Sequence, residues 1–400
     1  MWSRYRLLAV VLLSVLAQTT HAFPFTFEAR SLGMGGAAVA TADLGTAAWA
    51  NPAMLANQKM ERDWSMLIGF GAFLRDDDDL HTDVKDFQDA DERREAALDA
   101  SDAAGVIRST AEMRLILDGI DSKIIAPEAT AAIAVGAAFE SFSMAISARS
   151  DLIAGGVVTN ISCTPLIDPG CDSTELTSDE FNILNVEGVL ATEFGISFAR
   201  NFQLWERKVS IGIKPKIVEL QAFTYQESIL TADVDSDILD NDDNKADLGT
   251  FETIDLGFAV DLSDSFRLGL SLSNLITDDF DLGNQTLNLD TGARLGVAYF
   301  NEFMTIAADL DLIENEPLLA NDSFEGLKTQ YLAVGAEFNA FEYVKFRLGA
   351  TKNIASGISD GAKDIEYTAG VGFWLGFNLD VAALINDNTA GVFLQTGFQF

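Results

Sequence analysis

Histidine and cysteine are scarce in this sequence, which has two of each among its 400 residues. Hydrolases of the serine or cysteine type depend on a histidine that passes protons beside a nucleophile. His21 lies close to the N-terminus, and His81 lies in an acidic stretch with no nucleophile motif beside it. We therefore expect that the protein is not an enzyme, that it has no catalytic residues and that it binds no metal at a dedicated site.

Long apolar runs are also missing. The longest, residues 7–16, spans about ten residues, whereas a transmembrane helix needs roughly 20. This run follows Arg4 and Arg6 and precedes a small-residue cleavage site that ends at Ala22, which is the pattern of a secretory signal peptide. The sequence predicts export through a Sec signal peptide at residues 1–22 and no transmembrane helix.

Basic residues are few, because 26 lysines and arginines stand against 61 aspartates and glutamates, for a formal net charge of −35. Such a surface repels phosphate backbones, so direct nucleic-acid binding is not expected. Since 48% of the residues are hydrophobic, acidic and apolar residues must be segregated. The acidic runs at residues 76–79 and 233–247 lie between apolar segments, which favours solvent-exposed loops at these places.

One acidic run partly follows a calcium-loop pattern, because Asp233, Asp235 and Asp237 have the spacing of the first ligands of such a loop. Ile238 stands where a glycine is needed, and Asn244 stands where a glutamate is needed. A solvated acidic loop is therefore the preferred interpretation, with loose association of Ca²⁺ or Mg²⁺ as the alternative.

The two cysteines, Cys163 and Cys171, lie eight residues apart in a stretch that also holds two prolines and a glycine. Export would bring this stretch into an oxidising compartment, where a local disulfide is favoured. A metal site would need more ligands than two thiols. The sequence therefore predicts a disulfide between them.

Most apolar segments after residue 60 alternate large apolar side chains with small or polar ones, which is typical of strands with two unlike faces. In residues 266–272 four large apolar side chains alternate with Arg267, Gly269 and Ser271. Residues 344–349 and 391–400 follow the same pattern. The polar face is rich in glycine, alanine, serine and threonine, whereas a soluble sandwich would carry dense charge there. This composition favours the inside of a barrel.

Fourteen such segments occur, and long and short connections alternate between them until the last. Single-chain outer-membrane barrels have even strand numbers, tight periplasmic turns and long outer loops. The sequence therefore predicts a 14-stranded antiparallel transmembrane β-barrel in the bacterial outer membrane, with periplasmic termini and contacts to lipid and lipopolysaccharide. The segments are 63–74, 129–139, 142–154, 187–199, 207–219, 251–261, 266–276, 287–300, 302–312, 328–339, 342–353, 364–376, 378–386 and 390–400.

Aromatic residues gather beside the short connections, which predicts a periplasmic aromatic girdle. The terminal Phe400 is similar to the C-terminal aromatic signal of outer-membrane barrels. The girdle residues are Phe139, Phe142, Phe198, Phe202, Trp205, Phe300, Phe303, Phe338, Phe341, Tyr343, Phe373, Trp374 and Phe377.

Two segments do not fit a barrel wall. Residues 85–123 are rich in alanine and charged residues and lack proline, so we expect a helical insertion at about 81–125, extracellular by strand parity. Residues 29–55 combine clustered glycines and small side chains with a turn at Asn51-Pro52-Ala53. Small side chains suit a narrow lumen, so we expect residues 23–57 to plug a barrel formed by residues 58–400. A periplasmic tail is the alternative.

A nucleotide-binding loop is a further interpretation of this glycine cluster. The spacing of Gly33, Gly35 and Ala38 formally matches a dinucleotide fingerprint, but that motif must follow a buried strand and open a helix. Only about ten residues would precede it after signal cleavage. We therefore expect no cofactor.

The N-terminal segment resembles the beginning of the long-chain fatty-acid porin (FadL-type) superfamily, whose members have 14-stranded barrels with an N-terminal hatch. We assign Arg30, Gly33, Gly35, Gly36, Asn51 and Pro52 to this hatch motif. The residues that carry the resemblance are Ala29, Arg30, Leu32, Gly33, Met34, Gly35, Gly36, Ala37, Val39, Ala42, Asp43, Asn51, Pro52 and Ala53.

Within that superfamily the chain is most similar to the outer-membrane TraF-like family, which is named for conjugal transfer. This resemblance implies a structural or interaction role with envelope or conjugation-machinery proteins. Passive transport of hydrophobic small molecules is the alternative, although acidic outer loops would repel carboxylate substrates. The motifs are residues 76–89, 193–200, 214–216, 255–257 and 273–275.

Charged residues of both signs fall on the predicted inner faces, seven of each. Pairs across the barrel would close the lumen, and this is the preferred interpretation; a charge-lined path is the alternative. The residues are Lys208, Lys214, Lys216, Arg267, Arg294, Lys345 and Arg347, with Glu193, Asp255, Asp290, Asp309, Asp311, Glu337 and Glu366.

Overall fold

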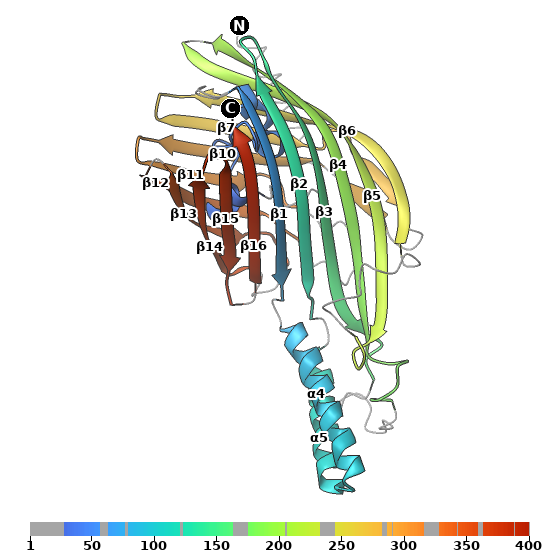
Figure 1. The fold of residues 1–400 in the computed structure, drawn as a ribbon. Coiled ribbons are helices and arrows are strands. Elements are labelled where there is room, and N and C mark those ends of the chain that lie inside the picture. The colour runs from blue at the N-terminus through green and yellow to red at the C-terminus, as the bar shows by residue number, and fades with distance from the viewer. Residues whose placement is uncertain are drawn as a thin grey trace.

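The computed structural model shows a closed antiparallel barrel (Figure 1). It describes residues 28–56, 63–76, 79–120, 123–162, 175–204, 206–232, 245–281, 286–289, 291–315, 328–341, 343–358, 363–387 and 389–399. The predicted signal peptide, both cysteines, the calcium-like residues Asp233, Asp235 and Asp237, and also Trp205, Asp290 and Phe400, lie outside these residues.

Fourteen strands form the barrel, each paired with its neighbours in sequence, and β1 closes it by pairing with β16. The prediction of a 14-stranded antiparallel barrel is confirmed. The strands are β1 Trp64–Arg75, β2 Ala126–Ala138, β3 Ser143–Thr159, β4 Ile183–Leu204, β5 Arg207–Ser228, β6 Lys245–Asp261, β7 Phe266–Ser273, β10 Gly292–Phe300, β11 Met304–Asp311, β12 Tyr331–Phe341, β13 Val344–Asn353, β14 Ile365–Trp374, β15 Asn378–Ile385 and β16 Thr389–Gln399.

Two parts of the wall differ from the predicted segments. The segment predicted at 287–300 is divided: β9 (Thr286–Leu289) pairs with β8 (Asp278–Asp281) in a separate two-stranded sheet, and only β10 joins the barrel. β4 and β5 each have 22 residues and extend beyond the predicted ends. Their extensions were not recognised because their outer faces pack against other parts of the chain instead of continuing the lipid-type pattern.

The alternation of side chains becomes an alternation of exposure around the wall. Outward-facing side chains such as Phe70, Phe194 and Leu348 are 58%, 54% and 59% exposed, while their inward-facing neighbours are buried or half-buried. Large exposed apolar surfaces are costly in water and mark a contact with lipid or protein. A barrel with this outer face is built for an apolar surrounding.

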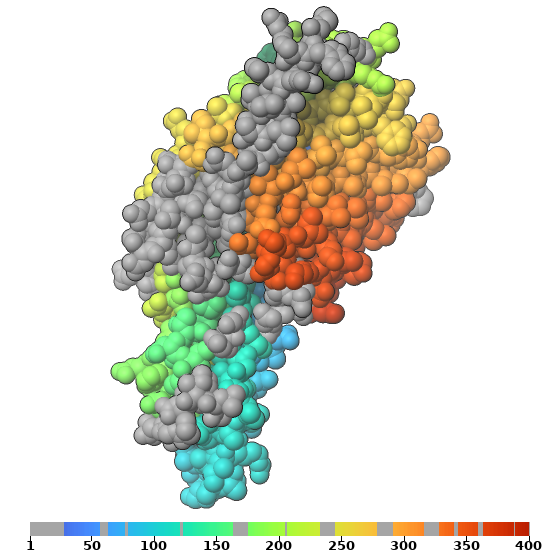
Figure 2. Space-filling view, turned by 180° about the vertical axis from the view of Figure 1, so that it is seen from behind, coloured from blue at the N-terminus to red at the C-terminus, as the bar shows by residue number. Residues whose placement is uncertain are grey.

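A helical hairpin follows β1 and projects from the barrel at the end away from the C-terminus (Figure 1). Seen from behind, it forms the cyan projection below the wall (Figure 2). It consists of α4 (Leu80–Asp99) and α5 (Ala103–Ile120), which confirms the predicted helical insertion and divides it in two. The Asp76 carboxylate accepts hydrogen bonds from the backbone N–H groups of Leu80 (2.7 Å) and His81 (3.0 Å) and so caps α4.

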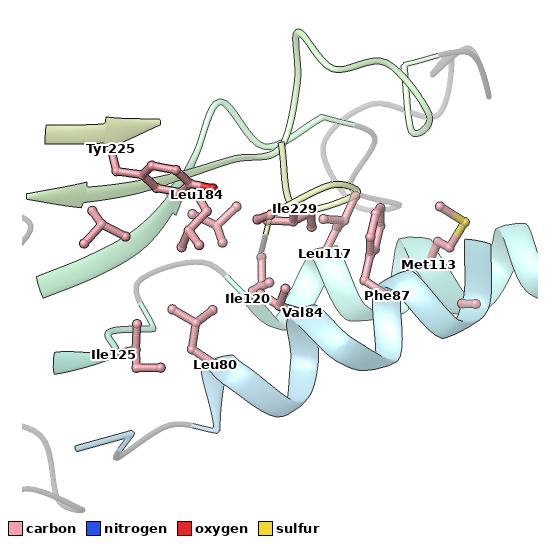
Figure 3. Packing of buried hydrophobic residues seen from close by; sticks show 14 of the residues in the cluster. Leu80, Val84, Phe87, Met113, Leu117, Ile120, Ile125, Leu184, Tyr225 and Ile229 are labelled. Carbon is pink, nitrogen blue, oxygen red and sulfur yellow. The ribbon is translucent and has the colours of Figure 1, made fainter. Parts of the chain in front are cut away.

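The base of the hairpin is fixed to the barrel by an apolar cluster (Figure 3). Phe87 of α4 and Leu117 of α5 are fully buried in it. Leu184 of β4 and Tyr225 of β5 come from the outer faces of the strand extensions. The hairpin therefore covers the apolar surface that the extended strands carry beyond the main wall.

No helix in the described part of the chain has both the length and the apolar character needed to span a membrane.

Candidate functional site

The lumen is filled by the N-terminal segment. Residues 28–56 form α2 (Ala29–Gly33), α3 (Ala47–Ala50) and a 3₁₀ helix, η1 (Pro52–Ala56), and nearly all of them are buried. α2 packs against β13 to β16, and η1 packs against β2 to β6. The interpretation of this segment as an internal plug, and not a tail, is confirmed for the described residues.

Six inward-facing glycines of the wall allow the plug backbone to lie directly on the strands. They form three directly opposed pairs on neighbouring strands, which we call the glycine belt: Gly212 with Gly257, Gly269 with Gly296, and Gly335 with Gly349.

A side chain at these positions would collide with the plug. A Cβ on Gly335 would lie 2.2 Å from the carbonyl oxygen of Met34, and a Cβ on Gly269 would lie 2.6 Å from that of Val39. Both obstacles are backbone atoms, which cannot move aside as a flexible side chain can. The fit between wall and plug is therefore tight at the level of the main chain.

The plug glycines serve its own turns. Gly35 and Gly36 have φ values of 70° and 89°, a region that other residues rarely adopt. The N–H of Gly35 donates to Thr368 Oγ1 at 2.9 Å. Gly33 instead lies flat against Arg347, since a Cβ there would be 3.1 Å from the Cβ of that arginine.

Asn51 ties the end of the plug to its middle and to the wall. Its Nδ2 donates to the carbonyl oxygens of Val39 (2.9 Å) and Phe258 (3.1 Å), and its Oδ1 accepts from the N–H of Ala53 (3.1 Å). Pro52 lies against Gly212 of the belt. The Asn-Pro pair of the sequence motif thus attaches the end of the plug to the barrel wall.

One ion cluster links the plug to β12, β13 and β15. Glu337 accepts from Arg30 of the plug at 2.9 Å and from Arg347 of the wall at 2.8 Å, and Arg347 also donates to Asp380 at 2.6 Å. Lys345 lies 3.8 Å from Glu337 and is half exposed. Removing one partner would leave a buried charge unpaired, which is strongly destabilising.

A second cluster holds the plug through its backbone. Asp309 accepts hydrogen bonds from the N–H groups of Ala38 (2.7 Å) and Val39 (2.9 Å). Arg294 lies 3.2 Å from Asp311 and donates to the carbonyl oxygen of Gly36 at 3.2 Å. Wall charges therefore bind main-chain groups of the plug as well as its side chains.

A third cluster joins neighbouring strands. Glu193 on β4 pairs with Lys214 and Lys216 on β5, the latter at 2.7 Å, and Lys216 lies 3.0 Å from Asp255 on β6. All four side chains are buried, and all four had been placed on inner faces from the sequence. The two positive and two negative side chains neutralise one another, so they do not form a path lined by charges of a single sign.

The remaining predicted lumen charges have several surroundings. Arg267 pairs with Asp261 at 2.7 Å and lies over the ring of Phe300, 4.9 Å from its centre, so Phe300 faces inward and departs from the predicted girdle. Glu366 lies 3.5 Å from Arg75. Lys208 is half-buried on β5.

Several buried ionisable groups were not predicted from the sequence, and Asp380 of the first ion cluster is one of them. Arg149 and Asp151 on β3 pair at 2.7 Å; they share the inner register of their strand, a signal that could have found them. Glu28 caps α2 by accepting from the N–H of Ser31 at 2.7 Å. Burial, with a further contribution from Asp43, raises the pKa of Glu28 to about 7.

No group of three or more histidine, cysteine, aspartate or glutamate residues in the described ranges could hold a metal ion. The disulfide between Cys163 and Cys171 stays a prediction, because both cysteines lie outside those ranges.

The girdle positions that the structure describes lie mostly at the tight-turn end with exposed rings. Phe139 and Phe142 stack at 5.0 Å between ring centres beside the β2–β3 turn, and Trp64 meets Phe139 edge to face at 6.4 Å. Phe303 and Tyr343 are 73% and 58% exposed. Aromatic rings that remain exposed at one rim suit a membrane interface.

Residues 48–311 match the model of a protein family described as "F plasmid transfer operon, TraF, protein". The comparison with curated proteins found no match.

Among solved structures, the chain is similar to the deltaS2S3 mutant of the TodX monoaromatic hydrocarbon channel, with 12% identity and a TM-score of 0.52 over 94% of this chain and 99% of that chain. It is also similar to the P. putida toluene transporter TodX, with 11% identity and a TM-score of 0.52 over 94% of this chain and 98% of that chain. At these identities the likeness shows the fold of outer-membrane hydrocarbon channels and no more.

Proposed function

The chain belongs to the F plasmid transfer operon TraF protein family, and from this premise we propose that it is a closed outer-membrane barrel with a structural or interaction role in conjugal transfer. The barrel is the membrane anchor, and the helical hairpin is the part presented to partner proteins. The acidic charge of the chain supports a role through proteins and not through contact with DNA.

The single observation that carries the closed state is the attachment of the plug. Its backbone lies on the glycine belt, and Glu337, Asp309 and Arg294 of the wall all bind it. Opening a path would break buried ion pairs and main-chain hydrogen bonds together. Contacts of this kind are costly to leave unmade in a low dielectric.

The outer face and the tight-turn rim of the barrel support an orientation in the outer membrane in which the short turns face the periplasm and the helical hairpin faces outward. Exposed apolar side chains cover the wall, and exposed aromatic rings gather beside the short connections. In barrels of this class short turns and both termini are periplasmic. The hairpin, at the opposite end (Figure 1), then stands outside the cell.

Conductance in planar bilayers tests the closed state. The full-length protein should show no steady ion current, whereas the double variant Glu337→Ala and Asp309→Ala should show frequent openings. Asp118→Ala, an exposed change on α5, is the matched control and should stay silent. Steady conductance of the unmodified protein would overturn closure.

The role in transfer is tested separately in the host cell. Deleting the gene should lower mating frequency. Restoring the full-length gene should return the frequency to its original value, whereas a gene that lacks residues 80–120 should not. A mating frequency that stays unchanged after deletion would remove the proposed role while leaving the closed barrel intact.

A passive channel for hydrophobic small molecules is a second candidate, and it is supported by the fold shared with hydrocarbon channels. An apolar recess of about 360 Å³ lies on the outer, lipid-facing side of β2 to β6, with Leu152, Leu190 and Phe223 among its lining residues, so it is a surface hollow and not a passage through the lumen. Flux of toluene into liposomes should then rise when residues 23–57 are deleted. If that deletion opens neither flux nor conductance, the segment is no hatch.

A further inference from the structure

A second, polar cavity lies at the tight-turn mouth of the barrel, between the plug and the inner faces of β1 and β13 to β16. Its volume is about 190 Å³. Arg30 and Asp43 of the plug contribute to its lining, as do Ser65, Arg347 and Asp380 of the wall. Neither the family nor the proposed closure of the barrel accounts for a cavity at this position.

Ser65 is an unused hydrogen-bonding group in this cavity. Its side chain is 2% exposed, and its hydroxyl has no hydrogen-bond partner in the described part of the chain. A Cβ on Gly45 would lie 2.9 Å from Ser65 Oγ and 3.4 Å from Asp43 Oδ1. Glycine at this position therefore leaves no side chain between the hydroxyl and the carboxylate, whose Oδ1 already accepts from the N–H groups of Gly45 and Thr46.

A second glycine keeps the other side of the cavity open. A Cβ on Gly372 would lie 2.3 Å from Asp380 Oδ1 and 2.9 Å from a terminal nitrogen of Arg347. The carboxylate and the guanidinium edge consequently face the space that a side chain would fill. Two pairs of polar groups thus line one cavity, the first from the plug and β1 and the second from β13 and β15.

The charges around the cavity are already neutralised. Arg347 binds both Glu337 and Asp380, and Arg30 binds Glu337. A net charge on a ligand would therefore be buried without a free counter-ion, which is costly. The groups left to a ligand are hydrogen-bonding edges: the Ser65 hydroxyl, carboxylate lone pairs and the amides of Asn378 and Gln395.

We propose that this cavity binds one neutral sugar unit through its hydroxyl groups. This volume is large enough for a cluster of waters, and a sugar ring replaces such a cluster with hydroxyls in fixed positions. Trp374 on the lining offers an apolar ring surface for the C–H face of the sugar. The half-exposed Lys345 places the mouth at the tight-turn end.

Ligand-detected NMR on the detergent-solubilised full chain tests the site, with N-acetylglucosamine and its linear tetramer as probes. Both should give saturation transfer, and Ser65→Ala should weaken binding roughly tenfold, the worth of one hydrogen bond. Ser147→Ala is the matched control, because Ser147 is another buried, unpartnered hydroxyl of the wall that does not line the cavity. It should bind as the unmodified protein does.

The two probes distinguish the source of the sugar. Tighter binding of the tetramer indicates a glycan strand that extends past the mouth, and equal binding indicates a free sugar; both support the proposal. Binding of acetate or glycine in place of the sugars, no binding at all, or equal loss in both serine variants would overturn it. Trp374→Leu gives an independent check, with binding lost while heat-modifiable gel migration shows that the barrel folds.

Discussion

At the scale of single residues, the glycine belt makes a sharp prediction. Gly335→Ala should lower the free energy of unfolding by about 1–3 kcal/mol, because its methyl group would meet the Met34 backbone and overpack the lumen. Gly119→Ala on α5 has nothing within 4 Å of the added Cβ and should be neutral or slightly stabilising. Denaturant unfolding in detergent measures both. Equal stability of the two variants would contradict a main-chain contact.

Glu28 predicts a pH dependence of plug stability. Its pKa is about 7 in the folded protein, against an ordinary value of 4.5. The folded state therefore holds this proton more tightly, and the stabilisation, about 3 kcal/mol, is complete below pH 4.5 and lost as the pH rises through 7. The charged groups that face it are Arg30 and Asp43 of the plug and Arg347 and Asp380 of the wall.

The unfolding midpoint should fall between pH 5 and pH 8, and Glu28→Gln should remove most of this fall. Glu180→Gln, a change at an exposed position, should keep it. A Glu28→Gln variant with the same pH profile as the unmodified protein would show that another group is responsible.

Residue-level prediction from sequence succeeded where strand parity was regular. Lys214, Glu193 and Asp255 could be placed in the lumen because period-2 alternation decides which face a strand residue occupies. Glu28 could not be found in this way, since its burial depends on where the plug lies inside the closed wall. Phe300 was misplaced because aromatic clustering was read without the register of its own strand.

At the scale of elements, the helical hairpin should be separable from the barrel. Phe87→Ala removes a fully buried ring from the apolar cluster at its base and should cost about 3–5 kcal/mol locally. Leu98→Ala, at a half-exposed position near the tip, is the control. Limited proteolysis should cut α4 and α5 much faster in the first variant only, while the barrel fragment stays intact. Equal cleavage would mean that the cluster does not fix the hairpin.

The elements themselves were largely predictable, because lipid-facing alternation and the alternation of loop lengths both follow from barrel geometry. The ends of β4 and β5 were not. Beyond Glu219 the outer face of β5 is covered by the hairpin, so the pattern that identifies a membrane strand no longer applies. The path of the plug was also beyond the sequence, since small residues indicate close packing but not the partner.

For the whole molecule, the orientation can be tested on intact cells. In a background lacking Cys163 and Cys171, a cysteine introduced by Ala104→Cys on the hairpin should react with a membrane-impermeant maleimide. One introduced by Glu302→Cys in the tight β10–β11 turn should react only after the outer membrane is permeabilised. Both positions are exposed in the structure. The opposite labelling pattern would invert the proposed topology.

The contact between plug and wall also constrains how the molecule is put together. The strands that carry the glycine belt lie between β5 and β13, and the ring is completed only when β16 meets β1. The plug backbone lies directly against the backbone of the wall at the glycine belt, so the segment could not be threaded through a barrel that had already closed. We therefore expect an ordered biogenesis. The N-terminal segment binds to the sheet while the sheet is still open, and the pairing of β16 with β1 then closes the barrel around it.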